Sequence, residues 1–126
     1  MLHDIGIRWC HAPAIHCHGD QPYILHGTLG ADLLRREGWP RHALVCERHT
    51  GTGITRQQIV AQQLPLDLDR SYEPQTLEEQ LVCYADKFYS KSHPERVLTV
   101  VEAAKSLERF GHEGVARFLD WAARFE

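Results

Sequence analysis

The chain has 126 residues, of which 43% are hydrophobic and 25% are charged, and its formal net charge is −3 with histidine neutral. This length and composition predict one globular domain over residues 1–126. The 14 lysines and arginines are scattered, which argues against a nucleic-acid partner, and no apolar run reaches the roughly 20 residues that span a membrane.

The start, MLHDIGIRW, lacks the basic, apolar and small-residue pattern of a signal peptide. We therefore expect a cytoplasmic protein whose four widely spaced cysteines are reduced. Nine histidines are an excess for this length. Because histidine is the commonest metal ligand, the position of each one matters.

The first half of the chain predicts two helices after an irregular segment over residues 7–23. Leu29, Leu33 and Leu34 repeat once per helical turn, and Gly38 is expected to close that helix. Pro40 then begins the next helix, in PRHALVCERH, because proline suits a first helical position.

The second half predicts four more helices and no strand. Thr55 with Gln58 and Thr76 with Glu79 have the spacing of capping boxes, and a polar loop over residues 64–75 separates the two helices that they begin. The last two helices are expected in HPERVLTVVEAAKSLERF and HEGVARFLDWAARFE. Their inward positions are expected to be Val97, Val100, Val101, Ala104 and Leu107 in the first, and Val115, Phe118, Leu119 and Ala122 in the second. The predicted fold class is all-α.

A His-Asp doublet stands almost at the beginning of the chain. His3 and Asp4 would point about 100° apart on a helix. Both can face one ion only at a helix end or at a break in the backbone, and Gly6 offers such a break.

Three later residues are candidates to join the doublet. His26, His49 and Asp86 are spaced so that each falls on a different predicted helix, the way in which helix bundles build metal sites. Alternatively, His26 caps a helix and His49 is solvated before a turn. Asp86 lies in the apolar run LVCYADKF, where a buried carboxylate without a partner is costly, so we expect it to bind metal.

The irregular segment CHAPAIHCHGD has two interpretations. Its potential tetrahedral zinc ligands are Cys10, His11, His16, Cys17 and His18. Their spacing is irregular, however, so we favour a loop that covers the site and selects the substrate, with His18 and Asp20 in contact with it.

The fragments LHDIG, HGTLGADLL, RHTGTG and YADKF, in this order, resemble the HD superfamily of metal-dependent phosphohydrolases. They are most similar to its dinuclear branch, which includes HD-type diadenosine tetraphosphate hydrolases. The resemblance covers about residues 1–90, and residues 92–126 are expected to be a helical scaffold. It implies an HD-domain bundle of about six helices that lacks the family's usual first helix and that helix's histidine.

The resemblance also implies the roles of individual residues. One or two divalent metals (Fe, Mn, Co, Ni or Zn, with Mg as an alternative) would be bound by His3, Asp4, His26, His49 and Asp86. Asp4 would bridge the metals. Arg48 and Lys87, each next to a ligand, would stabilise charge on phosphate, and Thr50 would contact the substrate. Arg48 stands where some relatives carry a further histidine.

The function implied is hydrolysis of a nucleotide or another small phosphoester by a metal-activated hydroxide, without a nucleic-acid or membrane partner. The alternative is a catalytically degenerate HD module that binds a nucleotide and acts through a partner. Phe118 and Trp121 are interpreted either as core residues or as the face of a homodimer.

Overall fold

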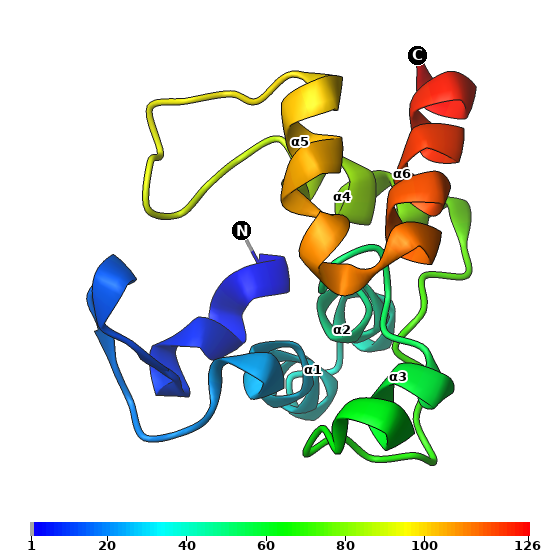
Figure 1. Ribbon diagram of the computed structural model, residues 1–126. Coiled ribbons are helices and arrows are strands. Elements are labelled where there is room, and N and C mark those ends of the chain that lie inside the picture. The colour runs from blue at the N-terminus through cyan, green and yellow to red at the C-terminus, as the bar shows by residue number, and fades with distance from the viewer. Residues whose placement is uncertain (1) are drawn as a thin grey trace.

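The computed structural model describes residues 2–126, and most of them are helical. The α-helices are His26–Arg36 (α1), Pro40–Glu47 (α2), Arg56–Gln62 (α3), Leu77–Asp86 (α4), Val100–Ser106 (α5) and His112–Phe125 (α6) (Figure 1). The 3₁₀ helices are Leu2–Trp9 (η1), Pro13–Ile15 (η2), Tyr23–Leu25 (η3) and Glu108–Phe110 (η4). The predicted class was all-α, and the chain is mostly helical.

The N-terminal segment η1 is a continuous 3₁₀ helix that packs on α1. Gly6 lies so close to the first turn of α1 that a Cβ built on it would be 1.9 Å from the carbonyl oxygen of His26 and 2.6 Å from the backbone nitrogen of Gly30. The expected backbone break at Gly6 is wrong, because the helix runs through it. The glycine permits close approach of two backbones, and this approach brings His3 and Asp4 to His26.

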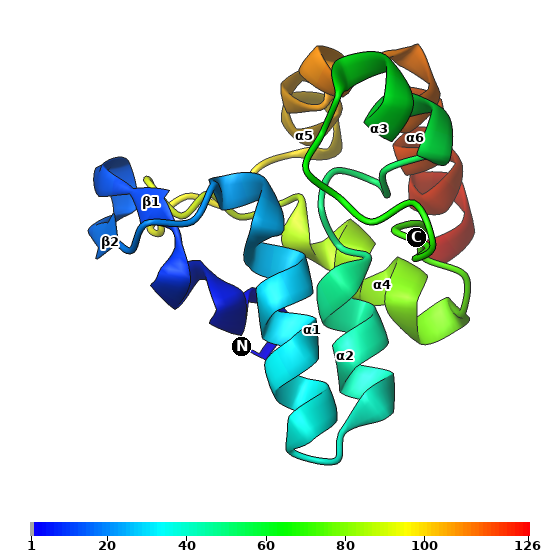
Figure 2. The same ribbon diagram turned by 90° about the horizontal axis from the view of Figure 1, so that it is seen from below.

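Helices α1 and α2 form an antiparallel hairpin (Figure 2). Gly38 has φ of +84° just beyond α1, and Pro40 is the first residue of α2. The predicted end of the first helix and the predicted start of the second are therefore confirmed. The contact between the two helices buries Ala31, Leu34, Ala43 and Cys46.

A second core lies between α4, α5 and α6. It buries Cys83, Tyr84, Ala103, Leu107, Phe118 and Trp121. Phe118 and Trp121 are 0% and 2% exposed, so they are core residues and the dimer interpretation of them is wrong. Leu119, expected inside, is 47% exposed because the buried stripe of α6 passes through Phe118 and Trp121 instead. Since α4 also packs on α2, it joins the two cores.

Threonine side chains begin the later helices, as predicted for two of them. Thr55 and Gln58 make both hydrogen bonds of a capping box at α3. Thr76 accepts from the backbone nitrogen of Glu79 at the start of α4. The Glu79 carboxylate accepts from the backbone of Gln75 rather than that of Thr76, so this second box is only half formed.

The helix expected from about residue 93 begins only at Val100, after an irregular loop over residues 87–99 (yellow in Figure 1). A capping box of Thr99 with Glu102 fixes this later start. Val97 and Val101, expected inside, are 65% and 77% exposed. The apolar spacing therefore predicts too early a start for this helix.

A small hairpin interrupts the otherwise helical chain. Strand β1 (His11–Ala12) pairs antiparallel with β2 (Cys17–His18), so the expectation of no strand is wrong at this place. Strands of two residues are too short to give an alternating pattern in the sequence. Across residues 2–126, none of the helices has both the length and the apolar character needed to cross a membrane.

The close approach at Gly6 gives a stability prediction. We expect Gly6→Ala to lower the free energy of unfolding by about 2–3 kcal/mol or more, because the new methyl group collides with backbone atoms that cannot rotate away. Thermal unfolding measures the change. Gly114→Ala is the matched control, because its Cβ would lie 3.3 Å from the nearest atom, a side-chain oxygen. Equal melting temperatures for Gly6→Ala and wild type would contradict this packing.

Candidate metal centre

Five side chains from distant parts of the chain meet beside the N-terminal end of α1. They are the five expected metal ligands: His3 and Asp4 from η1, His26 from α1, His49 from the turn after α2, and Asp86 from the end of α4. Nε2 of His3 lies 3.0 Å from Oδ1 of Asp86, and Nε2 of His49 lies 3.1 Å from Oδ1 of Asp4. His26 and His49 are buried and the other three are half-buried. The helical packing thus brings the whole expected set together.

Asp4 lies at the centre of this cluster. Its Oδ1 faces Nε2 of His49 at 3.1 Å and Nε2 of His26 at 3.6 Å. Its Oδ2 faces Nε2 of His3 at 3.3 Å and Nζ of Lys91 at 3.1 Å. A carboxylate whose two oxygens face different partners has the arrangement that a bridging ligand requires.

The hydrogen bonds of two histidines fix their tautomers. Nδ1 of His26 lies 2.7 Å from the carbonyl oxygen of Tyr23, and Nδ1 of His49 lies 2.6 Å from that of Cys46. Because a carbonyl oxygen only accepts, each Nδ1 carries a proton, and each neutral ring presents a lone pair at Nε2. These two Nε2 atoms are 2.9 Å apart. Two facing lone pairs repel each other unless a cation lies close to both.

Burial and charge set the protonation of the cluster. Burial lowers the pKa of His26 to about 4, and burial likewise lowers the pKa of His49. Burial also acts to lower the pKa of His3, but hydrogen bonds to Asp4 and Asp86 outweigh it and raise this pKa to about 9. The same bonds, against the effect of burial, hold the pKa of each carboxyl well below its usual range. At neutral pH the cluster therefore contains the neutral imidazoles of His26 and His49, the protonated imidazole of His3, and two ionised carboxylates.

Neighbouring groups hold the backbone of the cluster residues in place. Sγ of Cys46 donates to the carbonyl oxygen of His3 at 3.0 Å, and Sγ of Cys83 donates to that of His49 at 3.5 Å. Nζ of Lys87 donates to the same His49 oxygen at 2.8 Å. Burial raises the pKa of the Cys46 thiol to about 12 and that of Cys83 to about 11, so both stay protonated donors rather than thiolate ligands.

The donor set fits a divalent transition metal. His3, Asp4 and His49 each offer a ligand atom within 4.8 Å of the other two. Mixed imidazole and carboxylate donors suit Mn, Fe, Co, Ni or Zn, and ligating histidines commonly donate their other nitrogen to a carbonyl, as His26 and His49 do here. Within residues 2–126 no second group of this kind forms, so the geometry does not support the alternative zinc site in CHAPAIHCH.

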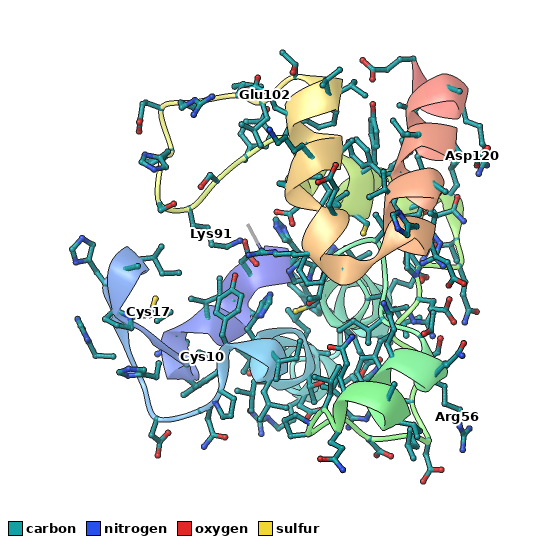
Figure 3. All side chains as sticks on the ribbon, viewed as in Figure 1. Cys10, Cys17, Arg56, Lys91, Glu102 and Asp120 are labelled. Carbon is teal, nitrogen blue, oxygen red and sulfur yellow. The ribbon has the colours of Figure 1, made fainter. Side chains whose placement is uncertain are left out.

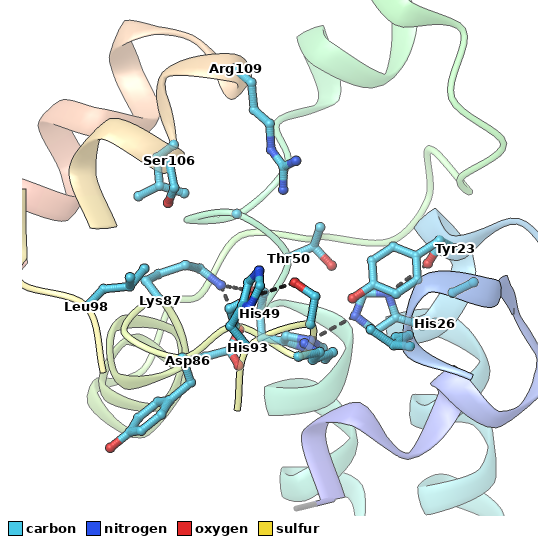
Figure 4. A pocket seen from close by; sticks show the side chains of 18 of the residues that line it. Tyr23, His26, His49, Thr50, Asp86, Lys87, His93, Leu98, Ser106 and Arg109 are labelled. Atoms are coloured by element: carbon cyan, nitrogen blue, oxygen red, sulfur yellow. Dashed lines mark hydrogen bonds and ion pairs between the residues drawn. The ribbon is translucent and has the colours of Figure 1, made fainter. Parts of the chain in front are cut away.

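A cavity of about 540 Å³ opens beside the cluster (Figure 4). His26, His49 and Asp86 line it, and so do Thr50 and Lys87, two of the expected substrate contacts. Nζ of Lys87 also lies 2.9 Å from Oδ2 of Asp86. The cavity therefore combines the candidate metal ligands with positively charged groups.

Three of the expected substrate contacts do not line this cavity. The guanidinium of Arg48 donates to Glu79 at 2.8 Å and to the carbonyl oxygen of Ser71 at 3.2 Å, so its charge is neutralised away from the cavity. His18 and Asp20 are exposed and do not line the cavity. The hairpin region reaches the cavity through Ala12, Ala14 and Ile15 instead.

Three cavity residues were missed from the sequence. Lys91, labelled in Figure 3, precedes the helix that was expected from residue 93, and no local pattern indicates that it approaches Asp4. Tyr23 stands three residues before His26, one turn of η3 away, and this spacing could have indicated that the two rings lie together. Arg109 reaches the cavity only through the tertiary packing that follows α5, and no local pattern indicates it.

Comparison with known proteins gives relatives of two kinds. The chain is 39% identical over 87 residues to an uncharacterized protein of Methanocaldococcus jannaschii, a match covering 68% of this chain and 43% of that protein. It is 34% identical over 103 residues to the tRNA (cytidine(56)-2'-O)-methyltransferase of Thermoplasma volcanium, covering 81% of this chain and 26% of the enzyme. It is 39% identical over 91 residues to the enzyme of the same name from Picrophilus torridus, a match that covers 71% of this chain and 23% of that enzyme.

The chain therefore spans less than half the length of the relatives that it matches. No protein-family model matches the chain, and no solved structure matches it.

These relatives overturn the function expected from the sequence. Both relatives with a named activity are methyltransferases of tRNA, not hydrolases of small phosphoesters. The expected phosphohydrolase activity, its nucleotide substrate and the absence of a nucleic-acid partner are therefore wrong, as is the alternative of a degenerate nucleotide-binding module. The scattered basic residues were misleading, because Lys87, Lys91 and Arg109 come together only at the cavity.

The geometry predicts how divalent metal binds. Asp4→Asn keeps the size of the side chain but removes its charge, so we expect Mn²⁺ or Zn²⁺ to bind at least about 100-fold more weakly in isothermal titration calorimetry after chelator treatment. Asp20→Asn and His18→Gln are matched controls, because both residues are exposed and lie outside the cluster. Wild-type metal affinity in Asp4→Asn would rule out this centre.

Proposed function

We propose that this chain is an HD-type helical module that binds tRNA, through a divalent metal centre and a basic cavity, in the service of 2′-O-methylation. The observation that carries the proposal is the match of most of this chain to two tRNA (cytidine(56)-2'-O)-methyltransferases. The match spans about a quarter of each enzyme, and the proposal assigns to this module the binding of the RNA. A tRNA partner also accords with a cytoplasmic location.

The cluster supplies the metal part of this proposal. Two neutral Nε2 acceptors 2.9 Å apart, together with ionised Asp4 and Asp86, favour a cation at this place. The residues that would hold it are His3, Asp4, His26, His49 and Asp86. A divalent cation there would take a phosphate oxygen as a further ligand and offset its charge.

Basic side chains around the cavity supply the electrostatic part. Lys91 is 3.1 Å from Asp4 but remains about one-third exposed, so it can also face a phosphate in the cavity. Arg109 lies across the cavity (Figure 4), and among residues 2–126 it has no carboxylate within ion-pair distance. Its guanidinium rests on the ring of Phe110 at 4.7 Å. Arginine and lysine contacts to phosphate provide much of the affinity of proteins for nucleic acids.

The described part of the chain favours binding over methyl transfer. Enzymes that hold a nucleotide cofactor at a parallel sheet do so at the carboxyl ends of its strands. Within residues 2–126 the one sheet consists of two antiparallel strands of two residues each. The proposal therefore gives this module the recognition of RNA.

The proposal predicts metal-dependent and salt-dependent tRNA binding. We expect the metal-loaded protein to bind an unmodified tRNA transcript in fluorescence anisotropy, and Lys91→Ala to lower the slope of log affinity against log salt by about 1. Lys105→Ala is the matched control, since this exposed lysine of α5 lies outside the cavity. If the wild type fails to bind tRNA at low salt, or if Lys91→Ala and Lys105→Ala bind alike, the proposed function is wrong.

A further inference from the structure

We propose that the cavity beside the metal centre receives one unpaired nucleotide of the RNA, with its base stacked on Tyr23 and its phosphate between Lys91 and Arg109. This inference rests on the proposed function and narrows it. It assigns the module to single-stranded segments (loops, bulges or ends) rather than to the helical stems of a tRNA.

The size and form of the cavity favour a single nucleotide. Its volume is about 540 Å³. Cavities of about 300–1,000 Å³ enclose one ligand of small-molecule size, which a nucleotide is. A double-stranded RNA, by contrast, is recognised across its wide, shallow minor groove by an extended surface. Only a nucleotide that is unpaired, or that is flipped out of an RNA duplex, can enter the cavity.

Tyr23 offers a platform for the base. Its ring centroid lies 4.5 Å from that of His26 at an interplanar angle of 31°, so one side of the ring is supported by a candidate metal ligand. The side chain lines the cavity and remains 39% exposed. The carbonyl oxygen of Tyr23 accepts from Nδ1 of His26 at 2.7 Å, which fixes this platform relative to the metal centre.

Cationic groups stand where the phosphate of the same nucleotide would lie. Lys91 reaches the cluster from the loop over residues 87–99, at Oδ2 of Asp4. Arg109 extends into the cavity from the segment after α5, toward Thr50 (Figure 4). A guanidinium matches two phosphate oxygens at once, whereas an ammonium acts as a point charge. Base platform, cations and metal ligands thus surround one space.

Polar groups of the loop complete the lining. Ser90 and Ser92 line the cavity, and their hydroxyl oxygens lie 3.0 Å apart. A hydroxyl both donates and accepts, as a ribose 2′-hydroxyl does. The cavity therefore carries groups suited to each part of a ribonucleotide: base, sugar and phosphate.

Binding of two short RNAs to the metal-loaded protein tests the inference. One is a labelled single strand of about five nucleotides, and the other is a blunt duplex of about 16 base pairs. We expect the single strand to bind at least about tenfold more tightly than the duplex at roughly 0.1 M salt. Tyr23→Ala should weaken single-strand binding by about 5- to 150-fold, the loss of one base–aromatic stack of about 1–3 kcal/mol.

Two variants control for loss of structure. Tyr23→Phe keeps the ring, so it should bind the single strand within about twofold of the wild type, because stacking and not the hydroxyl carries the affinity. Trp39→Ala removes another exposed aromatic ring, at the turn between α1 and α2 and outside the cavity, and should have no effect. Thermal unfolding of each variant shows whether the fold is kept.

The outcomes separate this inference from the proposed function. If tRNA binds but the single strand has no preference over the duplex, or if a folded Tyr23→Ala binds the single strand like the wild type, the inference is overturned and tRNA binding stands. If neither tRNA nor either short RNA binds, both are overturned.

Discussion

The close contact between η1 and the first turn of α1 is the interaction on which the candidate site depends. With no Cβ on Gly6, the two backbones approach until His3 and Asp4 reach the N-terminal end of α1. Asp4 then faces His26, the first residue of α1, and His49, which lies in the turn after α2. A short N-terminal segment thus completes a cluster that the longer helices alone would leave without its central carboxylate.

The same contact creates an electrostatic requirement. Ionised Asp4 and Asp86 are partly withdrawn from water, where an unpaired carboxylate is costly. In the protein chain itself, His3, Lys87 and Lys91 supply compensating positive charge. The facing Nε2 atoms of His26 and His49 receive no such compensation from a proton, because burial lowers the pKa of both rings. A divalent cation at this place would offset the charge of the carboxylates and accept the lone pairs of the imidazoles.

Local rules predicted much of the fold. Helix ends depend on contacts between residues close in the sequence. The end of α1 near Gly38, the start of α2 at Pro40 and the start of α3 after the Thr55 capping box are all where they were expected. The start of α5 was missed because the apolar run before it has helical spacing, while the cap at Thr99 decides where the helix begins.

The convergence of the five candidate ligands could be expected, because imidazole and carboxylate side chains at this spacing fall on different helices of a bundle. Their surroundings could not be found in this way. Arg48 was expected at the site but is held by Glu79, and Arg109 was not expected but faces the cavity. The reaction was also predicted wrongly, since a set of metal ligands indicates what can be bound and not which process uses it.

The state of the two facing imidazoles tests the central claim most directly. Nitrogen-15 NMR of the histidine rings, recorded at neutral pH on metal-free and zinc-loaded protein, distinguishes protonated, free and metal-bound nitrogens. We expect both His26 and His49 to carry the proton on Nδ1 and to show a large change at Nε2 when zinc is added. A proton on Nε2 of either ring, or Nε2 resonances that zinc leaves unchanged, would contradict the account.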